Sequence, residues 1–142
     1  MKRSEAIPAV ISAITASASP AWVVRNTRTE AVRRTIEDRL RTALGGYVLE
    51  IDPVAGASIA DVIKRGAFAS DSTVIMRLRL NTQTAPAGVT ADTMLDTADA
   101  IICALLSSQA LDASVQGNFL DELAEDVGLI TYQITATVQT DT

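Results

Sequence analysis

One cysteine is the first side chain in this sequence that could do chemistry, as a nucleophile or as a redox group. Cys103 is the single cysteine among 142 residues, which excludes an intramolecular disulfide. A thiol becomes reactive where its surroundings are electropositive and accessible. Cys103 instead lies between the apolar pairs Ile101-Ile102 and Leu105-Leu106, so we expect a buried, inert thiol.

A cluster of carboxylates near the C-terminal end could hold a divalent cation. Its members are Asp121, Glu122, Glu125 and Asp126. They lack the spacing and the glycine of a calcium-binding loop, which favours a solvated acidic edge. Glu37 and Asp38 form another acidic pair, but arginines flank them on a predicted helix, and ordinary ion pairing accounts for them.

The sequence contains no histidine, which is the commonest general base and metal ligand of proteins. It also lacks a glycine-rich phosphate loop, a Walker-type lysine motif and a nucleophile elbow. Gly45-Gly46 follows a predicted helix and is better explained as its C-terminal cap than as a phosphate cradle. We therefore expect no catalytic residue, no cofactor and no metal site. The sequence favours a protein that assembles with other proteins over an enzyme.

Arginines and neutral polar side chains form two candidate contact surfaces. Arg77 and Arg79 share the polar face of one predicted strand, and Gln133 and Thr135 lie on the polar face of another. Such a face is either solvated, or it pairs with a neighbouring subunit or lines a pore. The second surface belongs to a predicted helix and is either solvated or a docking surface. It consists of Arg28, Arg33, Arg34 and Arg41.

The net charge of −5 is distributed unevenly along the chain. Residues 1–65 sum to +3, and residues 66–142 sum to −8. This balance argues against general nucleic-acid binding, which needs a dominant basic surface. It is compatible with head-to-tail association, in which a basic patch of one copy meets an acidic patch of the next. Alternatively, the two halves mingle in space and the asymmetry carries no meaning.

Apolar residues at helical spacing predict three helices. They cover residues 4–18, 29–44 and 94–108. Pro20 ends the first helix, the second carries a narrow apolar stripe and a broad charged face, and Asp92 is the candidate N-cap of the third.

Alternation of apolar and polar residues predicts the strands. It is clearest in residues 73–81 and 129–139, and shorter runs occur at 22–25 and 47–51. Residues 53–72 are rich in Ala, Gly and Ser and are expected to form a long loop, which at this length is either mobile or functional.

These elements predict one α+β domain over residues 1–142, with a small, mostly antiparallel sheet and helices packed on one face. Residues 109–128 are ambiguous, because Phe119–Asp126 fits either a helical turn or an edge strand. No apolar run approaches the roughly 18 residues that suggest a membrane span.

The arrangement resembles the tail-terminator (tail-completion) proteins of long-tailed bacteriophages and related tail-like particles. The resemblance spans most of the chain and lies in element order and strand texture. Its features are the opening helix from Ser4, the strand Ser72–Asn81, the loop Ala85–Gly88, the helix Met94–Ser108 and the closing strand Ile130–Val138. The helix at 29–44 is longer than the family pattern suggests.

The resemblance implies a structural virion component assembled in the host cytoplasm. Members form rings, typically hexameric, that cap the tail tube and provide the attachment surface for the head-tail connector or neck protein. DNA only passes through the lumen, and no membrane is involved. A ring that uses the strand face implies that Arg77→Glu with Arg79→Glu would break the ring and leave the monomer folded.

Two other classes of protein fit the same residues. A head-tail connector of the same kind of particle is barely separable from a terminator by sequence, whereas a tail-tube protein should have more strands. A small dimeric α+β ligand-binding domain would use a pocket lined by aromatic side chains. These are Trp22, Tyr47, Phe119 and Tyr132.

Overall fold

Six strands form one mixed sheet in the computed structural model, which describes residues 1–17, 22–41, 46–64, 67–120 and 128–141. The strand order is β1-β2-β4-β6-β5, and β3 pairs with β4 beside that path. The described pairings are antiparallel except that of β1 with β2. In chain order the elements are a 3-10 turn (Arg3–Glu5), α1 (Ala6–Ser17), β1 (Trp22–Arg25), α2 (Glu30–Arg41), β2 (Val48–Ile51), β3 (Gly56–Lys64), β4 (Ala67–Asn81), α3 (Ala91–Ser107), β5 (Ala113–Leu120) and β6 (Leu129–Asp141).

The central strand is β4, because it combines the longest alternation with partners on both sides. β6 pairs with it from Ala69 to Asn81, while β2 and β3 follow one another along its other edge. Every second side chain of its second half is fully buried. These side chains are Val74, Met76, Leu78 and Leu80. The predicted antiparallel sheet with one apolar face is confirmed.

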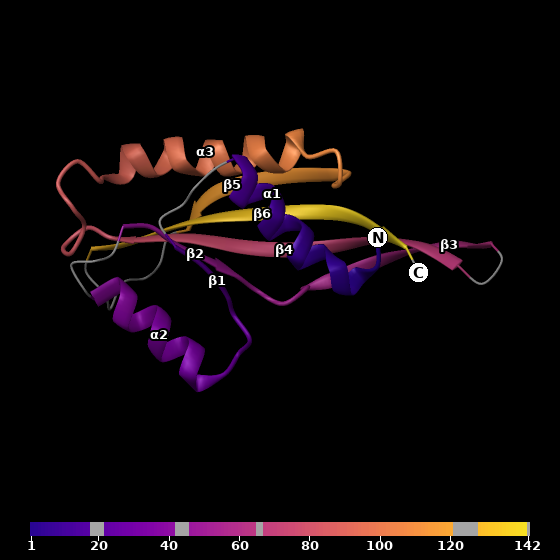
Figure 1. Cartoon of the computed structure of the whole chain (residues 1–142), viewed down its shortest axis with the longest axis horizontal. Helices are drawn as coiled ribbons and strands as arrows, with labels where there is room; N and C mark the ends of the chain where they lie inside the picture. The colour runs from indigo at the N-terminus through magenta and orange to yellow at the C-terminus, as the bar shows by residue number, and fades with distance from the viewer. Residues whose placement is uncertain (18–21, 42–45, 65–66, 121–127, 142) are drawn as a thin grey trace.

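The helices α1 and α3 cover the apolar face of this sheet (Figure 1). α1 buries Ile7, Val10 and Ile14 at the spacing of one helical face. α3 buries Met94, Ala98, Ile101, Ala104 and Leu105 in the same way. The main core therefore lies between two helices and the sheet, as the sequence predicts for this α+β class.

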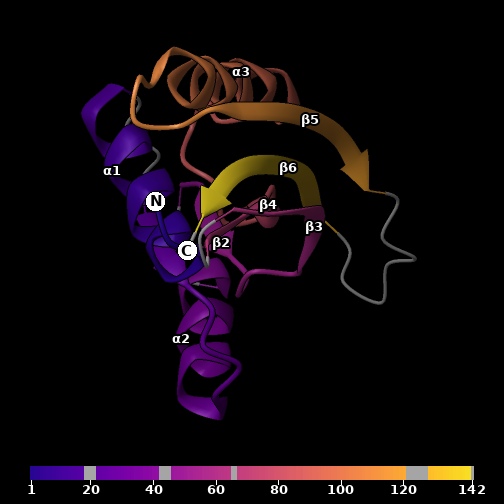
Figure 2. The same ribbon diagram turned by 90° about the vertical axis from the view of Figure 1, so that its right-hand side faces the viewer.

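The third helix, α2, departs from the expectation that the helices gather on one face. Its buried residues Ile36 and Leu40 form a separate small core with Val48 of β2. Neighbouring side chains of a strand point to opposite faces, so Val48 faces α2 while Leu49 faces the main core. α2 consequently lies on the other side of the sheet from α3 (Figures 1 and 2).

Two details of α3 differ from the sequence expectation. The N-cap is Thr90, not Asp92: the Thr93 amide donates to Thr90 Oγ1, and the Thr90 amide donates to Thr93 Oγ1 at 2.8 Å. Cys103 is exposed, not buried. Each helical residue advances by about 100°, and Cys103 is two residues from both Ile101 and Leu105, so it points away from the buried stripe even though its sequence neighbours are apolar.

The predicted loop at 53–72 is wrong for most of its length, because residues 56–64 form β3 and β4 already begins at Ala67. Ile59, Val62 and Ile63 favour a strand but do not alternate regularly with polar residues, and pairing with β4 satisfies the backbone groups of the segment. The ambiguous segment after α3 contains an edge strand, β5, at residues 113–120. Residues 121–127 lie outside the described part of the chain.

Within the described residues, no helix has the length and apolarity needed to cross a membrane.

Candidate functional site

The polar face of the sheet brings four of the sequence-predicted residues together. Arg77 of β4 lies opposite Gln133 of β6, and Thr135 follows two residues further along that strand, opposite Ile75. Arg79 lies two residues from Arg77 on the same face. On its other side β4 pairs with β2, which places Glu50 opposite Arg77.

Both arginines are engaged in ion pairs with buried carboxylates. The Arg77 guanidinium lies 2.5 Å from Asp52 Oδ2, and Arg79 Nε lies 3.2 Å from Glu50 Oε2. Glu50 and Asp52 are 6% and 4% exposed, and the arginine side chains are about a quarter exposed. A carboxylate buried to this extent needs a cationic or hydrogen-bonding partner, which the arginines supply.

This pairing changes the expected outcome of Arg77→Glu with Arg79→Glu. The double substitution would place four carboxylates side by side at a buried position, and like charges in that setting destabilise the fold itself. Loss of assembly in that variant would report unfolding. The variant therefore does not separate an interface from a structural ion-pair cluster.

The turn between β1 and α2 belongs to the same cluster. Asn26 Nδ2 donates a hydrogen bond to Glu50 Oε1, and the Asn26 amide donates to the Ile51 carbonyl at 2.8 Å. In the same turn, the Arg28 guanidinium lies 3.5 Å from Asp52 Oδ2. The cluster thus joins three segments of the chain: this turn, the end of β2, and β4.

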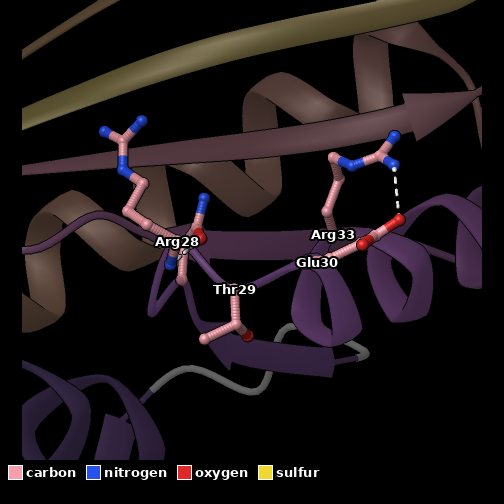
Figure 3. A pocket seen from close by; sticks show the side chains of 5 residues that line it. Arg28, Thr29, Glu30 and Arg33 are labelled. Atoms are coloured by element: carbon pink, nitrogen blue, oxygen red, sulfur yellow. Dashed lines mark hydrogen bonds and ion pairs between the residues drawn. The ribbon is translucent and has the colours of Figure 1, made fainter.

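Arg28 adopts a left-handed backbone conformation with φ of 63°. The Asn26 side chain stabilises the turn, because its Oδ1 accepts a hydrogen bond from the Arg28 amide at 2.8 Å. A surface pocket opens beside the turn; Arg28 and Thr29 point to opposite sides, and Glu30 lies beside Arg33 (Figure 3). The described residues that line it are Asn26, Arg28, Thr29, Glu30 and Arg33.

Replacing Arg28 by glycine should give a more stable protein than replacing it by alanine, by about 0.5–1 kcal/mol. Both variants lose the ion pair between the exposed Arg28 side chain and the buried Asp52, but only alanine retains a Cβ that the left-handed conformation disfavours. Urea denaturation of the two variants measures the difference. Equal stabilities would show that the turn relaxes when the arginine is removed.

The arginines of α2 lie on the opposite surface from α3. Arg33 and Arg34 are 62% and 69% exposed and pair within the helix, Arg33 with Glu37 and Arg34 with Glu30, each at 2.9 Å. Arg41 is exposed at the last residue of the helix. Of the sequence-predicted arginines, Arg28 alone joins this helix surface to the ion-pair cluster.

Sequence reasoning missed Asn26, Glu50 and Asp52. A signal was present, because Glu50 and Asp52 are spaced by two, as are Arg77 and Arg79, and residues two apart on strands share a face. Their pairing depends on the register between β2 and β4, which no local pattern specifies.

The other candidate chemistry receives little support from the described residues. Among them, no group of three or more Cys, Asp or Glu is placed to bind a metal. The acidic cluster at residues 121–126 lies outside the described part.

The aromatic residues proposed for a ligand pocket are separated into different contacts. Phe119 and Tyr132 pack edge to face at 5.0 Å, while the Tyr47 hydroxyl lies 2.6 Å from Thr93 Oγ1. The Trp22 side chain lies outside what the structure describes.

The sequence matches no model of a known protein family, and no curated protein is similar to it at a significant level.

Proposed function

We propose that this chain is a ring-forming tail-terminator subunit that caps the tail tube of a phage-like particle and provides the surface to which the head or neck attaches. The proposal starts from the resemblance in element order and strand texture. One structural observation supports it most directly: a β-arm that extends beyond the helix-covered body (Figure 1).

The β-arm consists of β3, the first part of β4 and the end of β6. β3 pairs with β4 from Gly56↔Thr73 to Lys64↔Ala67, and β6 pairs along the other side of β4 as far as Ala69↔Asp141. Figure 1 shows that α1 and α3 end before the tip of this arm. An extended arm without helical cover gains little stabilisation from the core of its own chain. Its exposed strand edge can instead contact a neighbouring molecule.

The orientation of the arm suits a protein with two kinds of neighbour. The arm follows the strand direction, whereas α2 and α3 lie on opposite sides of the sheet (Figures 1 and 2). Contacts along the strands and contacts across the sheet are therefore available at the same time. In a terminator ring, the arm would meet the last ring of tube protein, and the lateral surfaces would meet neighbouring subunits.

Shortening the arm should abolish capping without disrupting the ring. Because Ser58 pairs with Asp71, residues 59–70 can be replaced by Asn-Gly, which closes a two-residue hairpin. We expect the variant to form the same rings as the wild type, seen by native mass spectrometry and negative-stain images. It should no longer bind the ends of purified tail tubes.

Gln83→Ala is a matched control, because Gln83 is exposed beyond the opposite end of β4 and should leave both properties unchanged. If the shortened variant still binds tube ends, the arm is not required for capping. A wild-type chain that forms a stable dimer in place of a closed ring with a central hole would contradict the proposed function as a whole.

A further inference from the structure

Two oppositely charged helix surfaces lie on opposite sides of this molecule. The segment from Arg25 to Arg41, which contains α2, carries six arginines and three carboxylates, a net charge of +3. The segment 91–112, which contains α3, carries four aspartates and no lysine or arginine, a net charge of −4. The charge asymmetry of the sequence therefore survives folding at the two outer helices, although the halves mingle at the Arg77–Asp52 and Arg79–Glu50 pairs.

The outer surface of α3 combines carboxylates with apolar side chains. Asp92, Asp96 and Asp99 are exposed. Leu95 and Leu106 are 37% and 56% exposed, which is high for leucines of a helix that buries its opposite face. Leu95 lies between Asp92 and Asp96, and Leu106 lies in the last turn of the helix. Exposed apolar side chains together with charged ones are found at protein interfaces.

The outer surface of α2 is complementary in both respects. Its exposed arginines have long aliphatic stems that can cover leucine side chains while the guanidinium groups reach carboxylates. Arg33 and Arg34 are each more than 60% exposed, so their internal pairs with Glu37 and Glu30 leave several N–H donors accessible.

We propose that the α2 surface of one copy docks against the α3 surface of the next copy. A second copy is the partner because the chain itself carries both complementary charges. A symmetric α3–α3 contact would place aspartates against aspartates. Unlike surfaces on opposite sides of a subunit produce a head-to-tail contact, and such contacts close into a ring when the rotation between copies allows it. The inference rests on the proposed function for the ring, and it leaves the β-arm free.

A charge-swap experiment tests this contact directly. One variant carries Arg34→Glu and Arg41→Glu on α2, and the other carries Asp96→Lys and Asp99→Lys on α3. Each variant alone brings like charges together, and its self-association should weaken at least about tenfold in native mass spectrometry. An equimolar mixture restores opposite charges at every contact if the two variants alternate, so rings with an even number of copies should form again.

A matched control separates a specific contact from an effect of net charge. Lys2→Glu with Arg3→Glu changes the net charge by the same amount as the α2 variant, but both residues lie exposed at the N-terminal turn. This control should assemble like the wild type. Circular dichroism of every variant verifies that the monomers remain folded.

Each other outcome overturns the proposed contact. Single variants that assemble like the wild type would exclude the α2–α3 contact while leaving the ring, and with it the proposed function, intact. Failure of the mixture to assemble would show that the two surfaces do not meet each other. A wild-type chain that stays monomeric at every concentration would exclude a second copy as the partner. The capping of tube ends is measured in a separate experiment, so the two failures can be distinguished.

The exposed thiol of Cys103 provides a second measurement that does not depend on charge. Arg34→Cys adds a second thiol on α2, and a short bis-maleimide should then link it to Cys103 of the next copy. Head-to-tail contacts should give a ladder of covalent oligomers that ends at the ring number. The wild type, with Cys103 alone, is the control. A product that stops at the dimer in the variant would contradict the α2–α3 contact.

Discussion

Asp52→Ala is expected to lower the free energy of unfolding by about 3 kcal/mol. Asp52 is 4% exposed, and its Oδ2 lies within ion-pair distance of both Arg77 and Arg28. Removing the carboxylate leaves the three-quarters-buried Arg77 guanidinium without its partner. Breaking one side of a buried pair is far more costly than never having formed it, because the remaining charge keeps its desolvation penalty.

Urea denaturation followed by circular dichroism measures this loss. Glu37→Gln is the control, because it removes an ion pair of similar length, 2.9 Å to Arg33, from an exposed helix surface. Its effect should stay within about 0.5 kcal/mol. Asp52→Asn should fall between the two, since the amide keeps the shape and one acceptor. Equal effects of Asp52→Ala and Glu37→Gln would show that the cluster contributes little to stability.

Leu78→Ala is expected to lower the free energy of unfolding by about 3–5 kcal/mol. Leu78 is fully buried on the central strand, where it lies opposite Leu49 of β2 and Tyr132 of β6. Strands on both sides restrict the collapse of the cavity that the substitution would leave, which places the cost toward the upper end of the usual range.

Leu106→Ala is the matched control on the surface of α3. Leu106 is 56% exposed, so the same truncation should change stability by less than about 0.5 kcal/mol. The same variant should weaken self-association if α3 docks against α2 of the next copy. Thermal melts together with native mass spectrometry therefore separate the two roles: Leu78 supports the fold, and Leu106 supports the contact. A large loss of stability in Leu106→Ala would invalidate this separation.

The amino-acid sequence by itself determined those helices and strands in which buried apolar residues recur at regular spacing along one face. Val74 to Leu80 and Ile130 to Val138 alternate because one side of each strand contacts the core, and α1 and α3 repeat at 3.6 residues for the same reason. Such patterns are local, so the two main strands, the helices and the α+β class could be predicted. Charge asymmetry could be read in the same way, since it requires only counting.

Tertiary structure decided the features that depend on what a segment lies against. Residues 56–64 form a strand where they pair with the edge of β4. Ile59, Val62 and Ile63 favour a strand, but they do not alternate regularly with polar residues, so no local pattern predicts it. α2 lies apart from the other helices because Val48 points to the far face of the sheet. The cluster of Asn26, Glu50 and Asp52 with Arg77 and Arg79 exists only through the register of β2 on β4. A shift of β2 by one residue against β4 would move Glu50 and Asp52 to the other face of the sheet, away from Arg77 and Arg79. Pairing between strands distant in sequence is not encoded in local patterns.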